Sequence, residues 1–217
     1  MVQVAVQALP FLLQGALMTL KLTAIGATCG IILGTLVGLG RTSGIKWLDW
    51  LLRVYVEVLR GTPLYVQLLL VVFGLPEITG INFNEFTAAV ITISINSSAY
   101  VSEIIRAGIQ SIDKGQMEAA RSLGMSRFQA MVRIILPQAV RRVIPPLVNE
   151  IIALIKESSL VATVAIVELT RAGTLVSSRT YQPFPVYITV ALIYLCMTLT
   201  LSLLSGRLER KLNAATR

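Results

Sequence analysis

The chain has 217 residues, of which 55% are hydrophobic and only 14% are charged. A soluble globular chain averages about 25% charged residues, so this composition predicts an integral membrane protein with little length left for a soluble domain. The net charge of +8 is typical of cytoplasmic loops rich in lysine and arginine, which explain it better than a nucleic-acid partner does. The sequence has no histidine and two cysteines in apolar runs, so histidine chemistry is excluded and no disulfide framework is indicated.

The first apolar region runs from about Phe11 to Gly40 and is interrupted only by Lys21. At about 1.5 Å of rise per residue, it is longer than the roughly 30 Å hydrocarbon core of a bilayer. Because small residues at a spacing of four let helix backbones approach closely, we expect one face to pack against another membrane helix, in this subunit or a second one. That face carries Gly26, Gly30, Gly34 and Gly38. The first 20 residues contain no lysine or arginine, which argues against a cleaved signal peptide.

The second apolar region is weaker and is interrupted near its middle. Arg53, Glu57 and Arg60 fall on one polar face of a helix, and the two tryptophans before them suit a membrane interface. The run RGTP, which ends at Pro63, then breaks the helical pattern. We expect an interfacial or partly inserted helix, a kink, and then the membrane-spanning portion.

A basic stretch from Asp113 to Pro146 follows the third apolar region, which runs from Phe86 to about Ile105. It contains signals for two short helices. A capping box at Asp113 begins the first helix, with Gln three residues on, and Gly124 fits its end. The same capping pattern at Ser126 begins the second helix, and the prolines at positions 137, 145 and 146 indicate its far end. We expect this compact loop to present a surface to a partner.

The fourth apolar region, Leu147 to Val167, is interrupted by polar residues, and the fifth, Val186 to Leu204, is cleanly apolar. Lysine and arginine are frequent from position 106 to 142 and in the tail up to Arg217, whereas positions 76 to 85 contain none. Cytoplasmic loops carry the excess of these residues. We therefore expect an all-α membrane protein of about five transmembrane helices, with its N-terminus outside and its C-terminus in the cytoplasm.

Ionisable groups inside membrane segments cost about 2.5–3.5 kcal/mol each at the helix centre, so they tend to face a bundle interior or a wet cavity. Lys156 can instead pair with Glu157 or another acid and merely lock two helices, and Glu103 and Glu150 can lie near the cytoplasmic interface. Together with neighbouring hydroxyl and amide groups, these residues form two polar patches that suit a zwitterionic solute. The predicted solute-binding residues are Asn96, Ser97, Tyr100, Glu103, Lys156, Glu157 and Ser158.

The sequence carries no sign of catalysis. It lacks the nucleotide-binding pattern G-x-x-x-x-G-K-[ST], a cluster of metal ligands and a Ser/His/Asp set. We expect a non-catalytic chain that binds no cofactor itself. If it transports a solute actively, the energy comes from an ion gradient or from a partner.

The basic stretch contains the pattern EAA-x3-G-x9-I-x-L-P, from Glu118 to Pro137. In this pattern the chain resembles the permease subunits of bacterial ABC importers. The segments RGTPLYVQL, NSSAYVSEIIRAGIQSI and KESSL are similar to the polar amino-acid branch, which includes permeases for histidine, glutamine and arginine. In the last segment Glu157 stands where this branch usually has a shorter residue.

The resemblance implies a type I importer fold, with residues 1–217 forming a single transmembrane domain in the bacterial cell membrane and a cytoplasmic coupling loop at about 111–142. It implies a second permease subunit, identical or a paralogue, and two copies of a cytoplasmic ATPase that bind ATP and Mg²⁺. An extracytoplasmic binding protein would deliver the amino acid. The residues that would couple to the ATPase are Glu118, Ala119, Ala120, Arg121, Ser122, Gly124 and Met125.

Acidic residues in the predicted pocket favour a basic amino acid, namely arginine, histidine or lysine, as the solute. A permease for glutamine or glutamate is the alternative within the same family. A stand-alone ion-coupled transporter is an alternative of another class, although such transporters often have inverted repeats and no clear repeat occurs here. A non-transporting scaffold is a third possibility.

Overall fold

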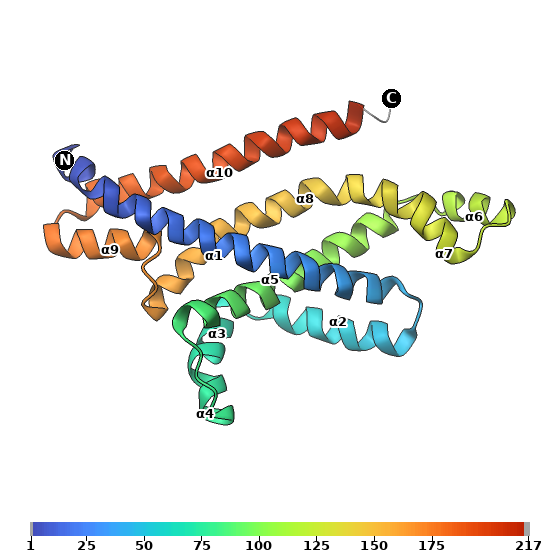
Figure 1. The fold of residues 1–217 in the computed structure, drawn as a ribbon, viewed down its shortest axis with the longest axis horizontal. Helices are drawn as coiled ribbons and strands as arrows, with labels where there is room; N and C mark the ends of the chain where they lie inside the picture. Colours follow the sequence, from blue (N-terminus) through green and yellow to red (C-terminus); the bar gives the residue numbers. More distant parts are fainter. Residues whose placement is uncertain (1, 215–217) are drawn as a thin grey trace.

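The computed structural model describes residues 2–214, and within that range it consists of helices without a strand, so the all-α prediction is confirmed. The long helices α1 (Val2–Thr42), α5 (Glu85–Gln110), α8 (Leu136–Glu157) and α10 (Pro183–Ala214) extend roughly along the longest axis of the molecule (Figure 1). The shorter α-helices are α2 (Lys46–Gly61), α3 (Leu64–Leu69), α4 (Leu75–Thr79), α6 (Lys114–Ser122), α7 (Arg127–Ala130) and α9 (Leu169–Thr180). They are joined by two π-helical turns, η1 (Leu70–Gly74) and η2 (Met131–Ile135), and a 3₁₀ helix, η3 (Ser158–Val164).

The glycine face of α1 packs against α5 of the same chain. A Cβ atom added at Gly30 would lie 2.7 Å from the Cβ atom of Ser97, and one added at Gly34 would lie 2.6 Å from the carbonyl oxygen of Ser98. These separations leave no room for a side chain, which confirms the predicted close packing. Successive glycines of α1 meet successive positions of α5 in the same order, so the two helices run parallel.

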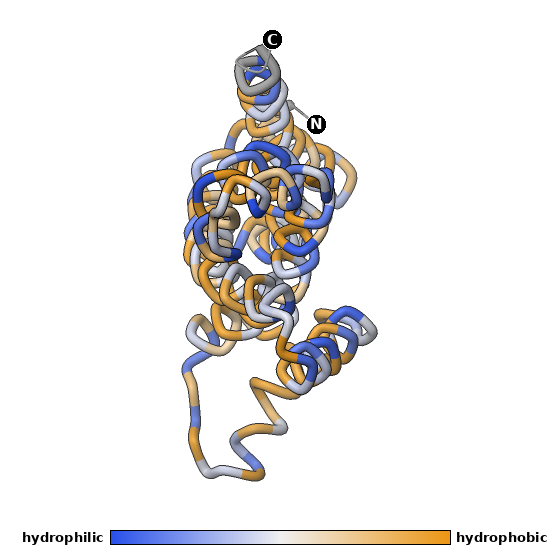
Figure 2. Tube along the Cα trace, turned by 90° about the vertical axis from the view of Figure 1, so that its right-hand side faces the viewer, coloured by the Kyte–Doolittle hydropathy of each residue, from blue (hydrophilic) through white to orange (hydrophobic). Residues whose placement is uncertain are grey.

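The second apolar region bends by 102° between α2 and the arm formed by α3 and α4. Thr62 and Pro63 are both extended, with ψ angles of 142° and 137°, and Pro63 has no backbone N–H with which to continue the helix. Helix α2 packs beside α1 and α5. The arm hangs away from the bundle in Figure 1, and the lowest part of the trace in Figure 2 is likewise set apart. The predicted kink is therefore confirmed, and the helix before it lies alongside the long helices.

Among the described residues, α1, α5 and α10 are long and apolar enough to cross a membrane, and the bent pair is a fourth candidate if it forms one span. Helix α8 covers much of the fourth predicted region but contains several charged residues. This region is also less helical than expected, because the α-helix ends at Glu157 and Ala165 adopts a left-handed conformation with φ of 65°. The count of about five spans and their orientation stay predictions, and Arg217 of the basic tail lies outside the described residues.

The caps of the basic stretch form largely as predicted. The carboxylate of Asp113 accepts a hydrogen bond from the N–H of Gly115 at 2.7 Å, whereas Gln116 contributes only its backbone N–H, which donates to the Asp113 carbonyl oxygen at 3.1 Å. Ser126 and Gln129 form a complete capping box at the start of α7. Gly124 has a φ of +83°, which favours glycine, and it ends α6.

The prediction that prolines end the second helix of this stretch is wrong. Pro145 and Pro146 lie inside α8, which follows α7 and η2 without a break. An interior proline costs about 3 kcal/mol of helix stability because it removes a hydrogen bond and crowds the preceding turn. Packing of α8 against α5 and α10 offsets this cost.

A buried carboxylate joins α1, α9 and α10. Glu168 caps α9 by accepting hydrogen bonds from the N–H groups of Thr170 (2.9 Å) and Arg171 (2.7 Å). Its oxygen also accepts from the Tyr194 hydroxyl of α10 at 2.8 Å and from Thr19 of α1 at 3.4 Å. Burial raises the pKa of Glu168, while these hydrogen bonds oppose the rise. Glu168 thus holds α9 against the two long helices.

Candidate functional site

A cavity of about 410 Å³ lies where the α2–α3 bend faces α5 and the end of α8. The bend contributes the segment from Arg60 to Leu64, α5 contributes Asn96 and Tyr100, and the end of α8 and the start of η3 contribute Glu157 and Leu160. Asn96 and Tyr100 stand near the middle of α5, at least ten residues from either end of the helix. The site is therefore formed by the α2–α3 bend, the middle of α5 and the end of α8.

The cavity wall contains both signs of charge. The guanidinium of Arg60 lies over the ring of Tyr100, with its central carbon 5.3 Å from the ring centre. This cation–π contact holds the arginine at the wall. Glu157, which is exposed, supplies an acid to the same cavity. A zwitterionic solute could therefore meet a cation and an anion in one open cavity.

The structure brings three of the predicted solute-binding residues together in this cavity, namely Asn96, Tyr100 and Glu157. Ser97 points elsewhere, and its hydroxyl donates a hydrogen bond to Glu150 of α8 at 3.1 Å. The remaining two residues on α8 and η3 are also not in the lining: Ser158 is buried and donates to the carbonyl oxygen of Ile155, while Lys156 is exposed.

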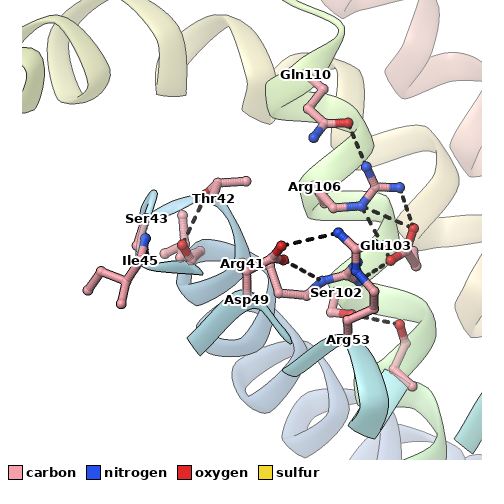
Figure 3. A network of polar contacts seen from close by, with 12 residues as sticks. Arg41, Thr42, Ser43, Ile45, Asp49, Arg53, Ser102, Glu103, Arg106 and Gln110 are labelled. Carbon is pink, nitrogen blue, oxygen red and sulfur yellow. Dashed lines mark hydrogen bonds and ion pairs between the residues drawn. The ribbon is translucent and has the colours of Figure 1, made fainter. Parts of the chain in front are cut away.

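Glu103 also lies outside the cavity lining, in a cluster of ion pairs toward the C-terminal end of α5 (Figure 3). It accepts hydrogen bonds from Arg41 of α1 and from Arg106, whose Nη2 atom lies 2.6 Å from its Oε2 atom. The Nε atom of Arg41 lies 3.6 Å from the Asp49 carboxylate of α2, which also pairs with Arg53. The cluster joins α1, α2 and α5.

Arg60 and Gln67 are among the residues of the site that were not predicted to bind the solute. Arg60 lines the cavity, and the helix break directly after it was the signal that could have indicated its place. Gln67 does not line the cavity but donates to the carbonyl oxygen of Leu59 at 2.7 Å and accepts from Asn96 at 3.0 Å. A glutamine in an apolar run was the signal for this buried contact.

A second candidate surface is the predicted coupling loop, at the end of the molecule opposite the N-terminus (Figure 1). Most of its predicted residues are exposed, whereas Ala120 is buried and Met125 is half-buried. The N–H of Met125 donates to the Ala120 carbonyl oxygen at 3.1 Å. Beside them, Leu123 and Phe128 are 83% and 77% exposed. These two exposed apolar side chains are candidates for contact with a partner. The predicted residues that are exposed are Glu118, Ala119, Arg121, Ser122 and Gly124.

Comparison with known proteins identifies the kind of chain that carries these two surfaces. Residues 26–214 match the family described as the binding-protein-dependent transport system inner membrane component. The chain belongs to this family. It is a multi-pass protein of the bacterial cell membrane and a permease of the ABC importer class.

Relatives assign the permease to the polar amino-acid branch. It is 42% identical over 206 residues to the arginine transport system permease protein ArtQ of Bacillus subtilis (strain 168), covering 95% of this chain and 94% of ArtQ. It is 41% identical to the glutamine transport system permease protein GlnP of Escherichia coli (strain K12), with 94% of each chain covered. The two relatives carry different amino acids in their names, so they do not resolve the solute of this permease.

Solved structures support the fold of the permease. A chain of an amino acid ABC transporter crystallised with histidines superposes with a TM-score of 0.91 at 48% identity, covering 95% of this chain and 96% of that one. The MetNI methionine ABC transporter, in an inward-facing conformation, superposes with a TM-score of 0.78 at 19% identity, covering 94% of this chain and 97% of that one. The predicted type I importer permease fold is thus confirmed.

Proposed function

We propose that this permease moves basic amino acids, arginine above all, through the cavity at the α2–α3 bend. The observation that carries the proposal is the presence of Arg60, Tyr100 and Glu157 in one cavity wall near the middle of α5. An amino acid has a carboxylate and an ammonium group, and a basic one adds a second cation. Arg60 would take the carboxylate through paired N–H donors, and Glu157 would take a cationic group.

A further acid supports a cationic rather than a neutral solute. Glu150 precedes Glu157 by two helical turns on α8, so both carboxylates lie on a similar face of that helix. The Ser97 hydroxyl donates to Glu150 at 3.1 Å and thereby orients it. Glu150 does not line the cavity, so in this proposal it would attract a cation on the path beyond the cavity rather than within it.

The energy for transport would come from a cytoplasmic ATPase, two copies of which bind ATP and Mg²⁺ and dock on the coupling loops. Leu123 and Phe128 flank the turn at Gly124 and are exposed. We propose them as apolar anchors for this ATPase, beside the charged residues of α6. The loop faces the cytoplasm and the N-terminus lies outside. A second permease subunit, identical or a paralogue, and an extracytoplasmic binding protein complete the assembly.

Transport by the reconstituted assembly tests this function. Proteoliposomes containing the permease and its ATPase, with the binding protein outside, should accumulate labelled arginine only when ATP is inside. Unlabelled lysine should compete more strongly than unlabelled glutamine. Stronger competition by glutamine would replace the basic solute with a glutamine-type solute, and uptake without ATP would contradict the ABC mechanism.

A further inference from the structure

The bend determines which way the buried side-chain amide of Gln67 is oriented. Its side-chain nitrogen donates to the carbonyl oxygens of Leu59 (2.7 Å) and Thr62 (3.1 Å), and to the Thr62 hydroxyl (2.9 Å). The 102° bend and Pro63 interrupt the helical hydrogen bonds here. Because a carbonyl oxygen can only accept, the nitrogen of Gln67 must face the bend.

The other end of Gln67 then determines how Asn96 is oriented. With its nitrogen at the bend, Gln67 directs its Oε1 atom at α5, where it accepts from the Nδ2 atom of Asn96 at 3.0 Å. A reversed Asn96 would set two oxygens against each other, and both residues are buried, at 9% and 2% exposure. Because the Asn96 nitrogen donates to Gln67, the Asn96 oxygen is free to accept a hydrogen bond in the cavity, which Asn96 lines.

We propose that Gln67 is a positioning residue for solute recognition, which fixes the Asn96 amide so that its oxygen accepts from an ammonium or guanidinium group in the cavity. The carbonyl oxygens at the bend orient the Gln67 amide, and the Gln67 amide orients that of Asn96. Gln67 itself does not contact the solute. This inference rests on the proposed function of the cavity. It explains how a neutral amide adds to the preference for a cation that Glu157 provides.

Equilibrium binding of labelled arginine to the purified permease–ATPase complex tests the inference. Loss of one hydrogen bond to a charged donor should weaken arginine about tenfold. We expect this loss in Gln67→Met and in Asn96→Leu, and no additional loss when the two are combined, because Gln67 acts through Asn96. Gln14→Met, on the exposed side of α1, is the matched control and should bind as the unchanged protein does.

A purely structural role for Gln67 predicts a different result, in which the two losses multiply to about a hundredfold in the double variant. If Gln67→Met does not fold, Asn96→Ser decides the question. Its hydroxyl can still donate to Gln67 but offers no carbonyl oxygen, so arginine should again weaken about tenfold. Unchanged binding by Asn96→Ser would overturn the inference.

Glu157→Gln in the same assay separates this inference from the proposed function. If Glu157→Gln weakens arginine while the Gln67 and Asn96 variants do not, the cavity is the solute site and only the role of Gln67 is wrong. If all these variants bind arginine as the unchanged protein does, the cavity itself is not the solute site and both proposals are wrong.

Discussion

Glu103 on α5 and Glu157 at the end of α8 are both acids on long helices, and their surroundings differ completely. Glu103 receives two arginines, Arg41 and Arg106, and its side chain is only 20% exposed. Glu157 lies open in the wall of a cavity. Arginines of the same chain compensate the charge of Glu103, whereas Glu157 can pair with a mobile cation.

Under the proposed function, the cost of placing a charge in a membrane would have two solutions. One is an ion-pair cluster that joins helices, and the other is a wet cavity that can receive a solute. Removing the first kind of acid should destabilise the protein while sparing recognition. Removing the second should impair recognition while sparing stability.

The largest expected effect on recognition is in Glu157→Gln. Loss of a charge-assisted contact should weaken arginine binding roughly 10- to 100-fold, with the melting temperature of the purified complex unchanged. Binding and thermal unfolding in detergent check this. Glu77→Gln, an exposed acid on α4, is the control. A normal affinity in Glu157→Gln would remove the difference between the two acids.

The reverse result is expected for Glu103→Gln. The Arg41 side chain is only 6% exposed, and loss of its partner leaves a buried cation poorly compensated. We expect the free energy of unfolding to fall by about 2–3 kcal/mol, below the usual 3–5 because Glu103 is partly exposed. Denaturant unfolding in detergent measures this, with arginine affinity unchanged in the folded fraction. Weakened arginine binding there would return Glu103 to the solute pathway.

Several features of the fold could be predicted from the sequence because residues close together in the chain determine them. The capping box at Ser126, the turn at Gly124 and the glycine face of α1 each depend on residues close together in the sequence. The family pattern between Glu118 and Pro137 likewise lies in one continuous segment.

The composition of the site was harder to predict, because distant residues decide it. Helical spacing grouped Glu103 with Asn96 and Tyr100, but Arg41, 62 positions earlier in the sequence, pairs with Glu103. Arg60 entered the cavity only because the chain bends by 102° after it. The spacing of residues along one helix predicts neither this ion pair nor the angle of the bend.

A smaller effect is expected from Arg60→Lys, which keeps the charge on the cation side of the cavity. An ammonium stacks less well on Tyr100 and cannot make paired N–H contacts to a carboxylate. Arginine affinity should fall about fivefold, a loss of about 1 kcal/mol, without a change in unfolding. Lys46→Arg, the reverse exchange at an exposed position, is the control. Unchanged affinity would mean that Arg60 does not meet the carboxylate.

The smallest effect is expected at the rim of the ion-pair cluster, in Arg53→Gln. Arg53 lies 3.1 Å from Asp49, but the side chains are 59% and 31% exposed, so water already solvates both charges. Exposed pairs of this kind contribute about 0.5 kcal/mol or less. Denaturant unfolding should therefore separate Arg53→Gln from Glu103→Gln by about 2 kcal/mol. If the two variants lose similar free energies of unfolding, the cluster stabilises the protein as one unit. The contribution of each ion pair would then not depend on how deeply Arg41 is buried.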